Sequence, residues 1–370
     1  MLLVVRPDAS SRWGGDTALA YDTRSTLATL GVMADLVETD EPATRGYDLA
    51  HVFNIGAPEI TQRQVDACTR QGTPVALSPV WLDLRELEGR GRRYEQLFVR
   101  ERSPRVVDAA LRRWANRDVE YFLNARQRRA LQRHRERQQA VAQCARVLLP
   151  NSAIEARDCL LHLNAHRCPL VVVPIPASLA PAAFWQSSRH GLVVVGRVET
   201  RKNQTALLYA LRNDTLPIDI LGAAYDPGLQ SAAGRWCQRA RFHGSVERSE
   251  LLTVLGRAAV HALVSWCETA GVATMEAALA GAQIVVSDRG AEVEYFGADA
   301  EYANPADPES IRAAVLRAEA RTPRAPGDRL DRRLRSWTWN QAGLATVRAY
   351  RIALGEVPGA DDFLSQPSAG

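Results

Sequence analysis

The chain has 370 residues, of which 46% are hydrophobic and 24% charged, and its formal net charge at pH 7 is +4. These values are typical of a soluble globular protein, and no apolar run approaches the roughly 20 residues that a membrane-spanning helix needs. The length favours two domains of roughly 150–200 residues each. The six cysteines form no C-x-x-C pair, which argues against a zinc site or a disulfide framework and favours a reducing cytoplasm.

The first half of the chain alternates short apolar runs with amphipathic stretches. Strands are predicted at 1–5, 32–38, 49–55 and 74–80, and helices at 16–31 and 59–72. This β-α-β-α order indicates parallel strands joined by crossover helices. Longer helices are predicted at about 104–116 and 118–143. A strand, a turn and a helix follow, with Ser152 as N-cap and Glu155 completing a capping box.

A second series of alternating elements starts near residue 190. Strands are predicted at 191–196, 217–222, 239–244, 260–265 and 283–287, and helices at 204–213, 248–258, 272–281 and 307–320. The chain is therefore expected to be α/β, with two doubly wound units in tandem that join at about 176–189. A last helix is predicted at 338–354, and the tail at 355–370 lacks apolar periodicity and is expected to be disordered.

Arginine is concentrated in one block of the first half. Seventeen arginines lie between Arg85 and Arg146. Such a block can face anionic lipid, a phosphate-bearing substrate or nucleic acid. It can equally be a solvated helix face in a protein with a composition bias, because lysine is almost absent from the whole chain.

Glycines follow the first predicted strand in the segment "RWGGDT". Gly14 and Gly15 precede the first helix, where backbone N–H groups and the helix dipole favour a phosphate. A bare tight turn explains the pair equally well. In tandem α/β units, ligands bind at the carboxyl ends of the strands, in the cleft between domains.

The segment "GRVETRKN" (196–203) follows the first strand of the second series and contains Lys202, the single lysine among the 46 Lys and Arg residues. Arg197 stands at the strand end, five residues before Lys202. Two cations that bracket one loop suit a diphosphate, and lysine is a compact point charge that can follow charge on a leaving oxygen. The alternative is a lysine retained by drift.

The segment "SWCETAGVATMEAALAG" places two carboxylates around a helix start. Glu268 lies in the loop after a strand and Glu276 lies eight residues on, roughly 12 Å away along a helix. The N-terminus of that helix, at 269–271, offers amides to a phosphate between the two carboxylates. Glu276 is embedded in an apolar segment, and a buried carboxylate needs a partner.

These motifs together resemble the C-terminal domain of family-4 retaining glycosyltransferases of the GT-B fold. The resemblance rests on Glu268-x7-Glu276, on Arg197 and Lys202, on "HGSVERSEL" (243–251) and on "SDRGAEVEYFG" (287–297). In the first half, "RWGGDT" and "GYDLAHVFNI" are more loosely similar to the N-terminal domain of bacterial members. The resemblance implies two Rossmann-like domains facing a central cleft, at 1–180 and 190–337, with 338–354 crossing back to the first domain.

The resemblance also implies roles for individual residues. Arg197 and Lys202 would stabilise a diphosphate leaving group, and Glu268 would hold the hydroxyls of the donor sugar. Glu276 would bind the ribose of a nucleoside-diphosphate sugar. The remaining donor-binding positions that it implies are Gly14, Gly15, Val246, Thr269, Ala270, Gly271 and Val272.

Two features bear on catalysis and on the acceptor. Many family members place a histidine at the end of the strand that corresponds to "PVALSPVWLD", where this chain has Ser78 and Pro79. Trp81 or Asp83 is the candidate to take over the substrate-orienting role of that histidine. His51, in the preceding strand, is expected to be structural. No Asp-x-Asp motif occurs, so we expect neither a metal nor another cofactor, and cationic side chains would stabilise the leaving group.

We therefore expect a metal-independent glycosyltransferase that uses a nucleotide-sugar donor and a glycan or lipid-linked acceptor in bacterial surface polysaccharide biosynthesis. The main alternative is a catalytically inactive nucleotide-sugar-binding protein. The arginine block lacks the interleaved aromatic residues that nucleic-acid binding needs. The first strand is not followed by the G-x-G-x-x-G motif that a nicotinamide dehydrogenase needs. The expected location is cytoplasmic, with peripheral contact to anionic lipid at the inner face of the cytoplasmic membrane.

Overall fold

The computed structural model describes residues 1–177, 185–186, 188–224 and 226–356. The chain divides into two compact units, each made of more than one segment. Unit 1 comprises Met1–Trp81, Gln132–Pro176 and Trp337–Gly370, and unit 2 comprises Leu82–Leu131 and Ala177–Ser336. The expected first domain, residues 1–180, is therefore not one unit, because its segment 82–131 belongs to unit 2. The tail predicted to be disordered lies, from residue 357 on, outside the described residues.

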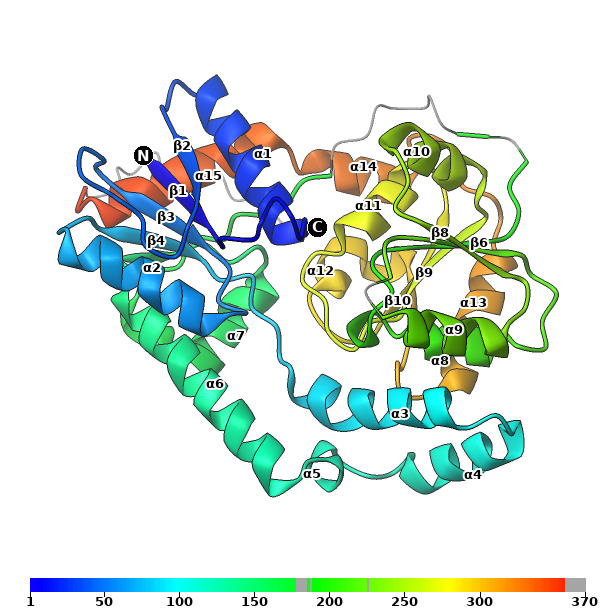
Figure 1. Cartoon of the computed structure of the whole chain (residues 1–370). Helices are drawn as coiled ribbons and strands as arrows, with labels where there is room; N and C mark the ends of the chain where they lie inside the picture. The colour runs from blue at the N-terminus through cyan, green and yellow to red at the C-terminus, as the bar shows by residue number, and fades with distance from the viewer. Residues whose placement is uncertain (178–184, 187, 225, 357–370) are drawn as a thin grey trace. The chain divides into compact units, whose positions relative to one another are not determined.

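Unit 1 is built on a five-stranded parallel sheet (Figure 1). Its strands are β1 (Leu2–Val5), β2 (Asp35–Glu38), β3 (Ala50–Phe53), β4 (Val75–Ser78) and β5 (Val147–Leu148). Their order in the sheet is β2-β1-β3-β4-β5. The chain therefore reverses direction across the sheet between β1 and β3, which makes the loops after these two strands the topological switch point.

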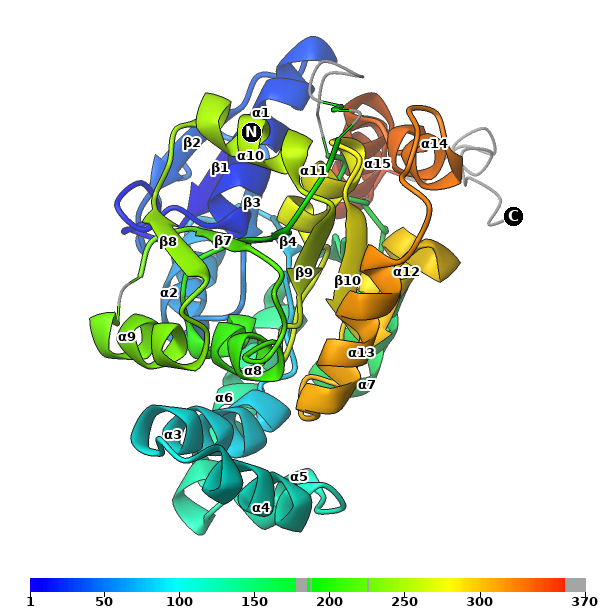
Figure 2. The ribbon, with the colours of Figure 1, turned by 90° about the vertical axis from the view of Figure 1, so that its right-hand side faces the viewer.

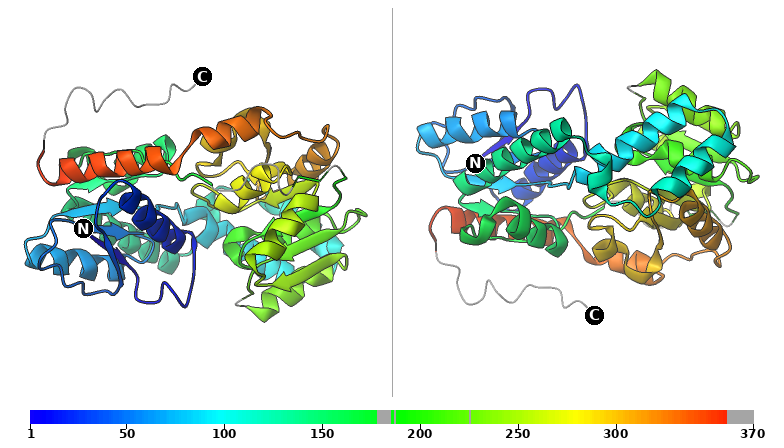
Figure 3. Two further views of the ribbon diagram at one scale, coloured as in Figure 1. Left: turned by 90° about the horizontal axis from the view of Figure 1, so that it is seen from above. Right: turned by 90° about the horizontal axis from the view of Figure 1, so that it is seen from below.

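Helices cover the sheet of unit 1. They are α1 (Gly15–Thr29), α2 (Pro58–Arg70), α6 (Ala125–Cys144, whose first residues belong to unit 2), α7 (Ala153–Leu163), the 3₁₀ turn η2 (Ala165–Arg167) and α15 (Trp339–Ala353). The last helix packs against α1 (Figure 3). A Cβ on Gly343 would lie 2.5 Å from Thr26 Cγ2, so glycine permits this close approach. Helix α15 belongs to unit 1.

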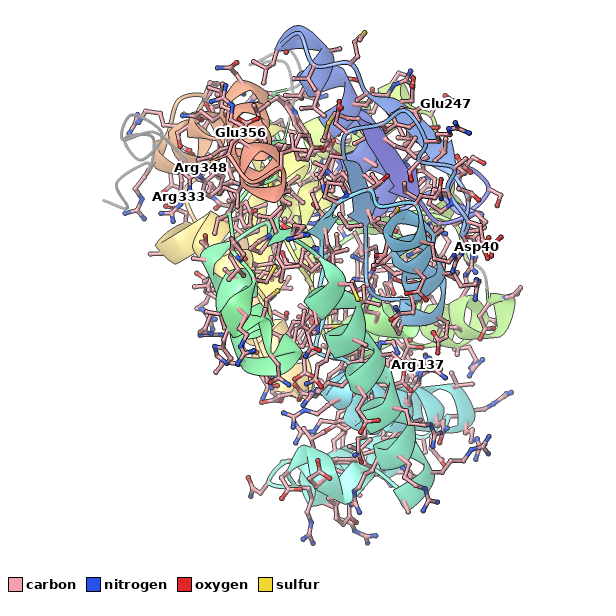
Figure 4. The ribbon with its side chains drawn as sticks, turned by 90° about the vertical axis from the view of Figure 1, so that its left-hand side faces the viewer. Asp40, Arg137, Glu247, Arg333, Arg348 and Glu356 are labelled. Atoms are coloured by element: carbon pink, nitrogen blue, oxygen red, sulfur yellow. The ribbon has the colours of Figure 1, made fainter. Side chains whose placement is uncertain are left out.

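Ion pairs fix the outer side chains of unit 1. Arg137 on α6, labelled in Figure 4, pairs with Glu59 on α2. Arg63 pairs with Asp40 at 2.8 Å. These exposed pairs contribute little to stability, on the order of 0–1 kcal/mol each, so burial of the apolar strands holds this unit together.

Unit 2 is built on a six-stranded parallel sheet. Its strands are β6 (Leu192–Val195), β7 (Ile218–Leu221), β8 (Ala240–Gly244), β9 (Val260–Leu263), β10 (Gln283–Ser287) and β11 (Glu301–Ala303). Their order is β11-β10-β9-β6-β7-β8. The switch point lies between β6 and β9, so the loops that follow these two strands meet at one edge of the sheet.

Two groups of helices pack in unit 2. From the second half of the chain come η3 (Thr200–Lys202), α8 (Gln204–Ala210), α9 (Pro227–Trp236), α10 (Arg248–Arg257), α11 (Val272–Leu279), α12 (Glu292–Phe296), η4 (Gly297–Asp299), α13 (Pro308–Glu319) and α14 (Arg329–Ser336). From the inserted segment 82–131 come the π-helical turn η1 (Leu87–Gly91), α3 (Arg92–Arg100), α4 (Pro104–Trp114) and α5 (Val119–Phe122).

The inserted segment is held by aromatic residues. Figure 2 shows α3 beside α8 and α9. The Phe98 ring lies 5.1 Å from that of Tyr209, and Trp236 Nε1 donates to the Phe98 carbonyl at 3.0 Å. Tyr94 is 1% exposed and packs edge-on against Trp266 at 5.5 Å. The segment lies between two parts of unit 1 in the sequence. It belongs to unit 2 because burial of these large apolar rings stabilises it there.

Most predicted elements are present with boundaries within a few residues. The helix predicted at 118–143 is interrupted at Leu123 and Asn124, where the Asn124 side chain accepts from Gln127 N and caps α6. Ser152 caps α7 as predicted, but Glu155 accepts from Asn151 N and Trp81 N, so the capping box does not close. Within the described residues, no helix combines the length and the apolarity needed to cross a membrane.

Candidate active site

The loops after β6 and β9 bring opposite charges together at the switch point of unit 2. The first loop ends in η3, where Asn203 adopts a left-handed conformation (φ 58°). The Asn203 amide donates to the carbonyls of Val264 and Pro305, at 3.2 and 2.9 Å. Trp266 N also donates to the Arg201 carbonyl at 2.8 Å. These bonds fix the two loops to each other before any ligand binds.

Glu268 is the centre of the resulting cluster. Lys202 Nζ donates to Glu268 Oε2, and Arg201 Nη1 lies 3.3 Å from the same oxygen. Arg201 Nη2 also pairs with Glu199 at 2.9 Å. The Glu268 side chain is 9% exposed and that of Lys202 is 13% exposed. The pairing of Lys202 with Glu268 was not predicted, and Arg201 was not identified at all, although it stands next to Lys202.

The protonation states in this cluster follow from burial and pairing. Burial by itself favours the neutral form of Glu268, but the charges of Lys202 and Arg201 outweigh it and lower the pKa of Glu268 to about 2. Burial and the nearby Lys202 lower the pKa of His261 to about 3. His261 Nε2 lies 3.2 Å from Thr274 Oγ1. At neutral pH the cluster therefore contains an ionised carboxylate and a neutral imidazole.

Arg197 occupies a different place from Lys202. Its Nη2 lies 3.7 Å from Glu199 Oε2, and its side chain is 31% exposed. Gly196, just before it, has φ 145°, and its carbonyl oxygen would lie 2.2 Å from a Cβ on Gly222. Two glycines are thus needed where the chain leaves β6 beside β7. The structure brings Arg201, and not Arg197, onto Glu268.

The start of α11 lies directly after Glu268. Gly271 is the N-cap in a left-handed conformation (φ 62°), and α11 begins at Val272, so Thr269 and Ala270, which were predicted to belong to the helix N-terminus, lie in the loop before it. A helix N-terminus presents unpaired N–H groups that favour an anion. One turn further, Glu276 pairs with Arg248 of α10 at 2.6 Å, which is the partner that its apolar surroundings required.

A second carboxyl group, Glu292, is buried near this helix start. It is 0% exposed, and neither oxygen has a hydrogen-bond partner of ordinary geometry among the described residues. A Cβ on Gly271 would lie 3.0 Å from Glu292 Oε1. Burial and the charge of Glu268 raise the pKa of Glu292 well above its ordinary value. The sequence analysis did not identify Glu292, although it lies inside the segment "SDRGAEVEYFG".

The inserted segment supports the loops of this cluster. A Cβ on Gly91 would lie 3.2 Å from Trp266, two residues before Glu268. Arg289 Nε pairs with Glu86 at 2.7 Å, and Thr200 donates to Glu95. Part of the arginine-rich block therefore braces the loops that carry Lys202, Glu268 and Glu292. Val246, the predicted neighbour of a nucleotide base, is half-buried in the loop between β8 and α10.

The glycine pair of unit 1 lies at the switch point of its own sheet. Gly14 is the N-cap of α1, and Gly15 is its first residue. A Cβ on Gly15 would meet no atom within 4 Å. Asp16 holds the turn, since Arg6 Nε and Asn54 Nδ2 both donate to its carboxylate, at 3.3 and 2.8 Å. The backbone at Gly15 is therefore open to a ligand group.

The three candidate acceptor residues are divided between the units. Ser78, at the end of β4, bonds His51 Nε2 at 2.9 Å, and His51 Nδ1 bonds Tyr350 at 2.8 Å. Burial lowers the pKa of His51 to about 3, consistent with a structural histidine. Trp81 is buried and stacks on His162, whereas Asp83 belongs to unit 2. These contacts do not assign an acceptor role to any of the three.

Among the described residues, no group of three or more His, Cys, Asp or Glu side chains could hold a metal ion.

Comparisons with known proteins extend these observations. Residues 189–320 match the sequence profile of the family described as "Glycosyl transferases group 1". A search of curated protein sequences finds no match. Among solved structures, sucrose-phosphate synthase from Thermosynechococcus elongatus is similar with a TM-score of 0.68 and 14% identity, covering 95% of this chain and 98% of that chain.

Two further solved structures give the same result. Anabaena Alr3699/HepE, in complex with UDP and glucose, has a TM-score of 0.56 and 13% identity over 96% of this chain and 97% of that chain. The α,α-trehalose-phosphate synthase (UDP-forming) from Burkholderia xenovorans, in complex with glucose-6-phosphate, has a TM-score of 0.54 and 13% identity over 92% and 79% of the two chains. At such low identity these matches establish the fold alone.

The predicted fold class is thereby confirmed, since two parallel-sheet domains of α/β type match the GT-B fold of these proteins. Within this fold, residues 189–320 are the part of the chain that is similar to the group 1 glycosyl transferase profile.

Proposed function

We propose that this chain is a retaining glycosyltransferase that moves a sugar from a nucleoside-diphosphate sugar to a glycan or lipid-linked acceptor. The observation that carries the proposal is the pairing of Lys202 with the buried, ionised Glu268 at the switch point of unit 2, next to the start of α11. The group 1 glycosyl transferase profile covers these residues. One structural neighbour binds UDP and glucose and another is a UDP-forming synthase, which supports a nucleotide-sugar donor here.

Lys202 would act on the leaving group. When the glycosyl–phosphate bond breaks, negative charge builds up on the diphosphate, and a fixed cation stabilises it without rearranging. Lys202 Nζ has three donors, of which one is used by Glu268. The others remain for phosphate oxygens, and Arg197, from the same loop, would add a second cation. With both in place, no metal ion is required to stabilise the leaving group.

The two glutamates would bind the two sugars of the donor. Glu268 has its pKa lowered to about 2, so it accepts hydrogen bonds and would take them from donor sugar hydroxyls. Glu276, oriented by Arg248, would accept from the ribose hydroxyls. Between them, the amides around Ala270, Gly271 and Val272 would receive the diphosphate. Gly14 and Gly15, with an open backbone at the start of α1, would also bind phosphate.

The opposite charges of Lys202 and Glu268 support an active enzyme. A buried carboxylate without a cationic partner is strongly disfavoured, so Lys202 has a structural reason to stay near Glu268. The selection of the only lysine for this position, within a chain rich in arginine, favours catalysis over the alternative of an inactive nucleotide-sugar-binding protein. A point charge on a flexible stem can serve Glu268 and a phosphate in turn, whereas a planar guanidinium has less freedom.

The proposed setting is bacterial surface polysaccharide biosynthesis, at the cytoplasmic face of the membrane. The helix α4 supports membrane contact because Arg105, Arg112 and Arg113 are exposed on it beside Val106, which is 47% exposed. Each basic residue near an anionic lipid surface contributes about 1 kcal/mol. Co-sedimentation with liposomes should therefore rise with anionic lipid and fall in an Arg112→Gln/Arg113→Gln variant. Binding that ignores lipid charge would contradict membrane contact.

The function is tested with a panel of UDP-, GDP-, ADP- and dTDP-sugars. The wild-type protein should release the nucleoside diphosphate from one of them, by transfer or by slow hydrolysis, and NMR should show the anomeric configuration retained in the product. Lys202→Ala should lose at least about 100-fold in kcat, and Lys202→Arg should recover only part of it. Full activity in Lys202→Ala, or binding of a donor without any turnover in the wild type, would contradict the proposal.

A further inference from the structure

Unit 2 contains a cavity at the edge of its sheet opposite the Lys202–Glu268 cluster. Its volume is about 420 Å³, and the first residues of β6 and β7, Leu192 and Ile218, line it. Lys202 and Glu268 follow the carboxyl ends of β6 and β9, so the length of the strands separates the two places. Ligand cavities in proteins range from roughly 300 to 1,000 Å³, and this cavity falls within that range.

The cavity carries an excess of positive charge. Its lining includes Arg239, Arg241 and Arg257 against one carboxylate, Asp219. Asp219 is already engaged twice, by Arg257 at 3.3 Å and by His243 at 2.7 Å. Within the part of the chain that the structure describes, neither Arg239 nor Arg241 forms an ion pair. Two guanidinium groups therefore line the cavity without an ion-pair partner among the described residues, beside a carboxylate that other side chains already engage.

Arg239 is held in place by neutral groups. Its Nη2 donates to the carbonyls of Leu211 and Arg212, at 3.0 and 3.4 Å. Its Nε is buried and has no hydrogen-bond partner in the structure. Arg241 follows two residues later on β8, opposite Asp219 in register. Arg239 lies in the turn just before β8, and both side chains line the same cavity.

The rest of the lining is mostly apolar. Its apolar part is formed by Leu192, Pro217, Ile218, Val254 and Ala258, and the polar side chains of His190 and Gln238 also line the cavity. Gly191 adopts φ 73°, and a Cβ there would lie 3.0 Å from the Pro217 carbonyl, so a side chain would be strained at this position. An apolar surface beside the held guanidinium of Arg239 and the exposed guanidinium of Arg241 suits a small molecule with an anionic group at one end and an uncharged body at the other.

We propose that this cavity binds a small phosphorylated molecule, whose phosphoryl oxygens accept hydrogen bonds from Arg239 and Arg241. Guanidinium groups bind phosphate bidentately, and charge-assisted bonds of this kind are roughly twice as strong as neutral ones. A neutral or cationic occupant would leave the guanidinium groups partly desolvated and uncompensated. The site is separate from the proposed donor site and does not depend on sugar transfer.

Isothermal titration calorimetry with inorganic pyrophosphate and with glucose 6-phosphate tests the proposal. At least one probe should bind the wild type and should bind about tenfold more weakly, a loss of about 1.4 kcal/mol, to Arg239→Gln/Arg241→Gln. Binding of glucose 6-phosphate alone would show that the apolar surface contributes, and binding of both that the phosphoryl group suffices. The single variant Arg241→Gln, which alters an exposed side chain, guards against misfolding of the double variant.

Two controls locate the binding. Arg112→Gln/Arg113→Gln removes the same charge from exposed positions of α4 and should leave the affinity unchanged. Lys202→Ala weakens the proposed donor site, where pyrophosphate would also bind, and should leave the binding of glucose 6-phosphate unchanged. Failure of both probes to bind the wild type would overturn the proposal. Wild-type affinity for both probes in Arg239→Gln/Arg241→Gln, or loss of glucose 6-phosphate binding in Lys202→Ala, would also overturn it.

Discussion

Replacing Lys202 with methionine removes the ammonium group but keeps most of the side-chain volume. Glu268 would then remain buried with Arg201, at 3.3 Å, as its closest cation. The pKa of Glu268 is about 2 in place of its ordinary 4.5. At about 1.4 kcal/mol for each pKa step of one, the folded protein stabilises the ionised form by roughly 3 kcal/mol, which Lys202 and Arg201 share. We therefore expect Lys202→Met to lower the free energy of unfolding by about 2–3 kcal/mol at pH 7.

The pH dependence gives the sign of the effect. Because the pKa of Glu268 is lower in the folded chain, its stabilisation is present above its ordinary pKa of 4.5 and is lost as the pH falls toward about 2. The difference between wild type and Lys202→Met should therefore narrow over this range. Urea unfolding followed by tryptophan fluorescence and by circular dichroism, at several pH values, measures it, with separate transitions fitted for the two units.

Arg197→Met is the matched control, because Arg197 belongs to the same loop but contacts Glu199 at 3.7 Å and is 31% exposed. Its loss should cost less than about 1 kcal/mol. If Lys202→Met unfolds no more easily than Arg197→Met at pH 7, the electrostatic account of Glu268 is wrong. A gap that stays constant below pH 4.5 would refute the assigned protonation state.

Three further predictions concern neighbouring groups. Glu292→Gln should raise the Tm at neutral pH. Because the pKa of Glu292 is raised in the folded chain, its carboxyl group ionises only in the unfolded chain as the pH rises above 4.5, and the wild type loses stability there. A difference in Tm between variant and wild type that is the same at pH 4 and pH 8 would argue against this account. Gly222→Ala should lower the free energy of unfolding by at least about 2 kcal/mol, since its Cβ would lie 2.2 Å from the Gly196 carbonyl oxygen. Gly244→Ala is the control, because Gly244 has φ 70° but a Cβ there would meet no atom within 4 Å, and its free energy of unfolding should fall by less in the same urea assay. If sugar transfer is established, treatment with EDTA should leave the rate unchanged, and a loss that Mg²⁺ or Mn²⁺ restores would disprove metal independence.

The arginine block shows where local patterns stop being informative. Periodicity identifies α4 and most of α6, but the glycines at 89 and 91 hide the turn η1 and the helix α3 that follows it. Nothing in the order of the chain indicates that the segment 82–131 packs on unit 2. The segment packs there because Tyr94 and Phe98 contact aromatic residues that are more than 100 positions away in the sequence. Burial of apolar surface, and not sequence proximity, selects those partners.

The sequence by itself determined the alternation of strands and helices. With it came the loops in which Lys202 and Glu268 would lie and the helix that carries Glu276, because parallel strands place all such loops at one edge of a sheet. Only the tertiary structure decided the partners: Arg201 for Glu268, Arg248 for Glu276, and a buried position for Glu292. The physical reason is that residue type and spacing fix local backbone geometry, whereas the direction of a side chain and the charges that it meets depend on how distant segments pack.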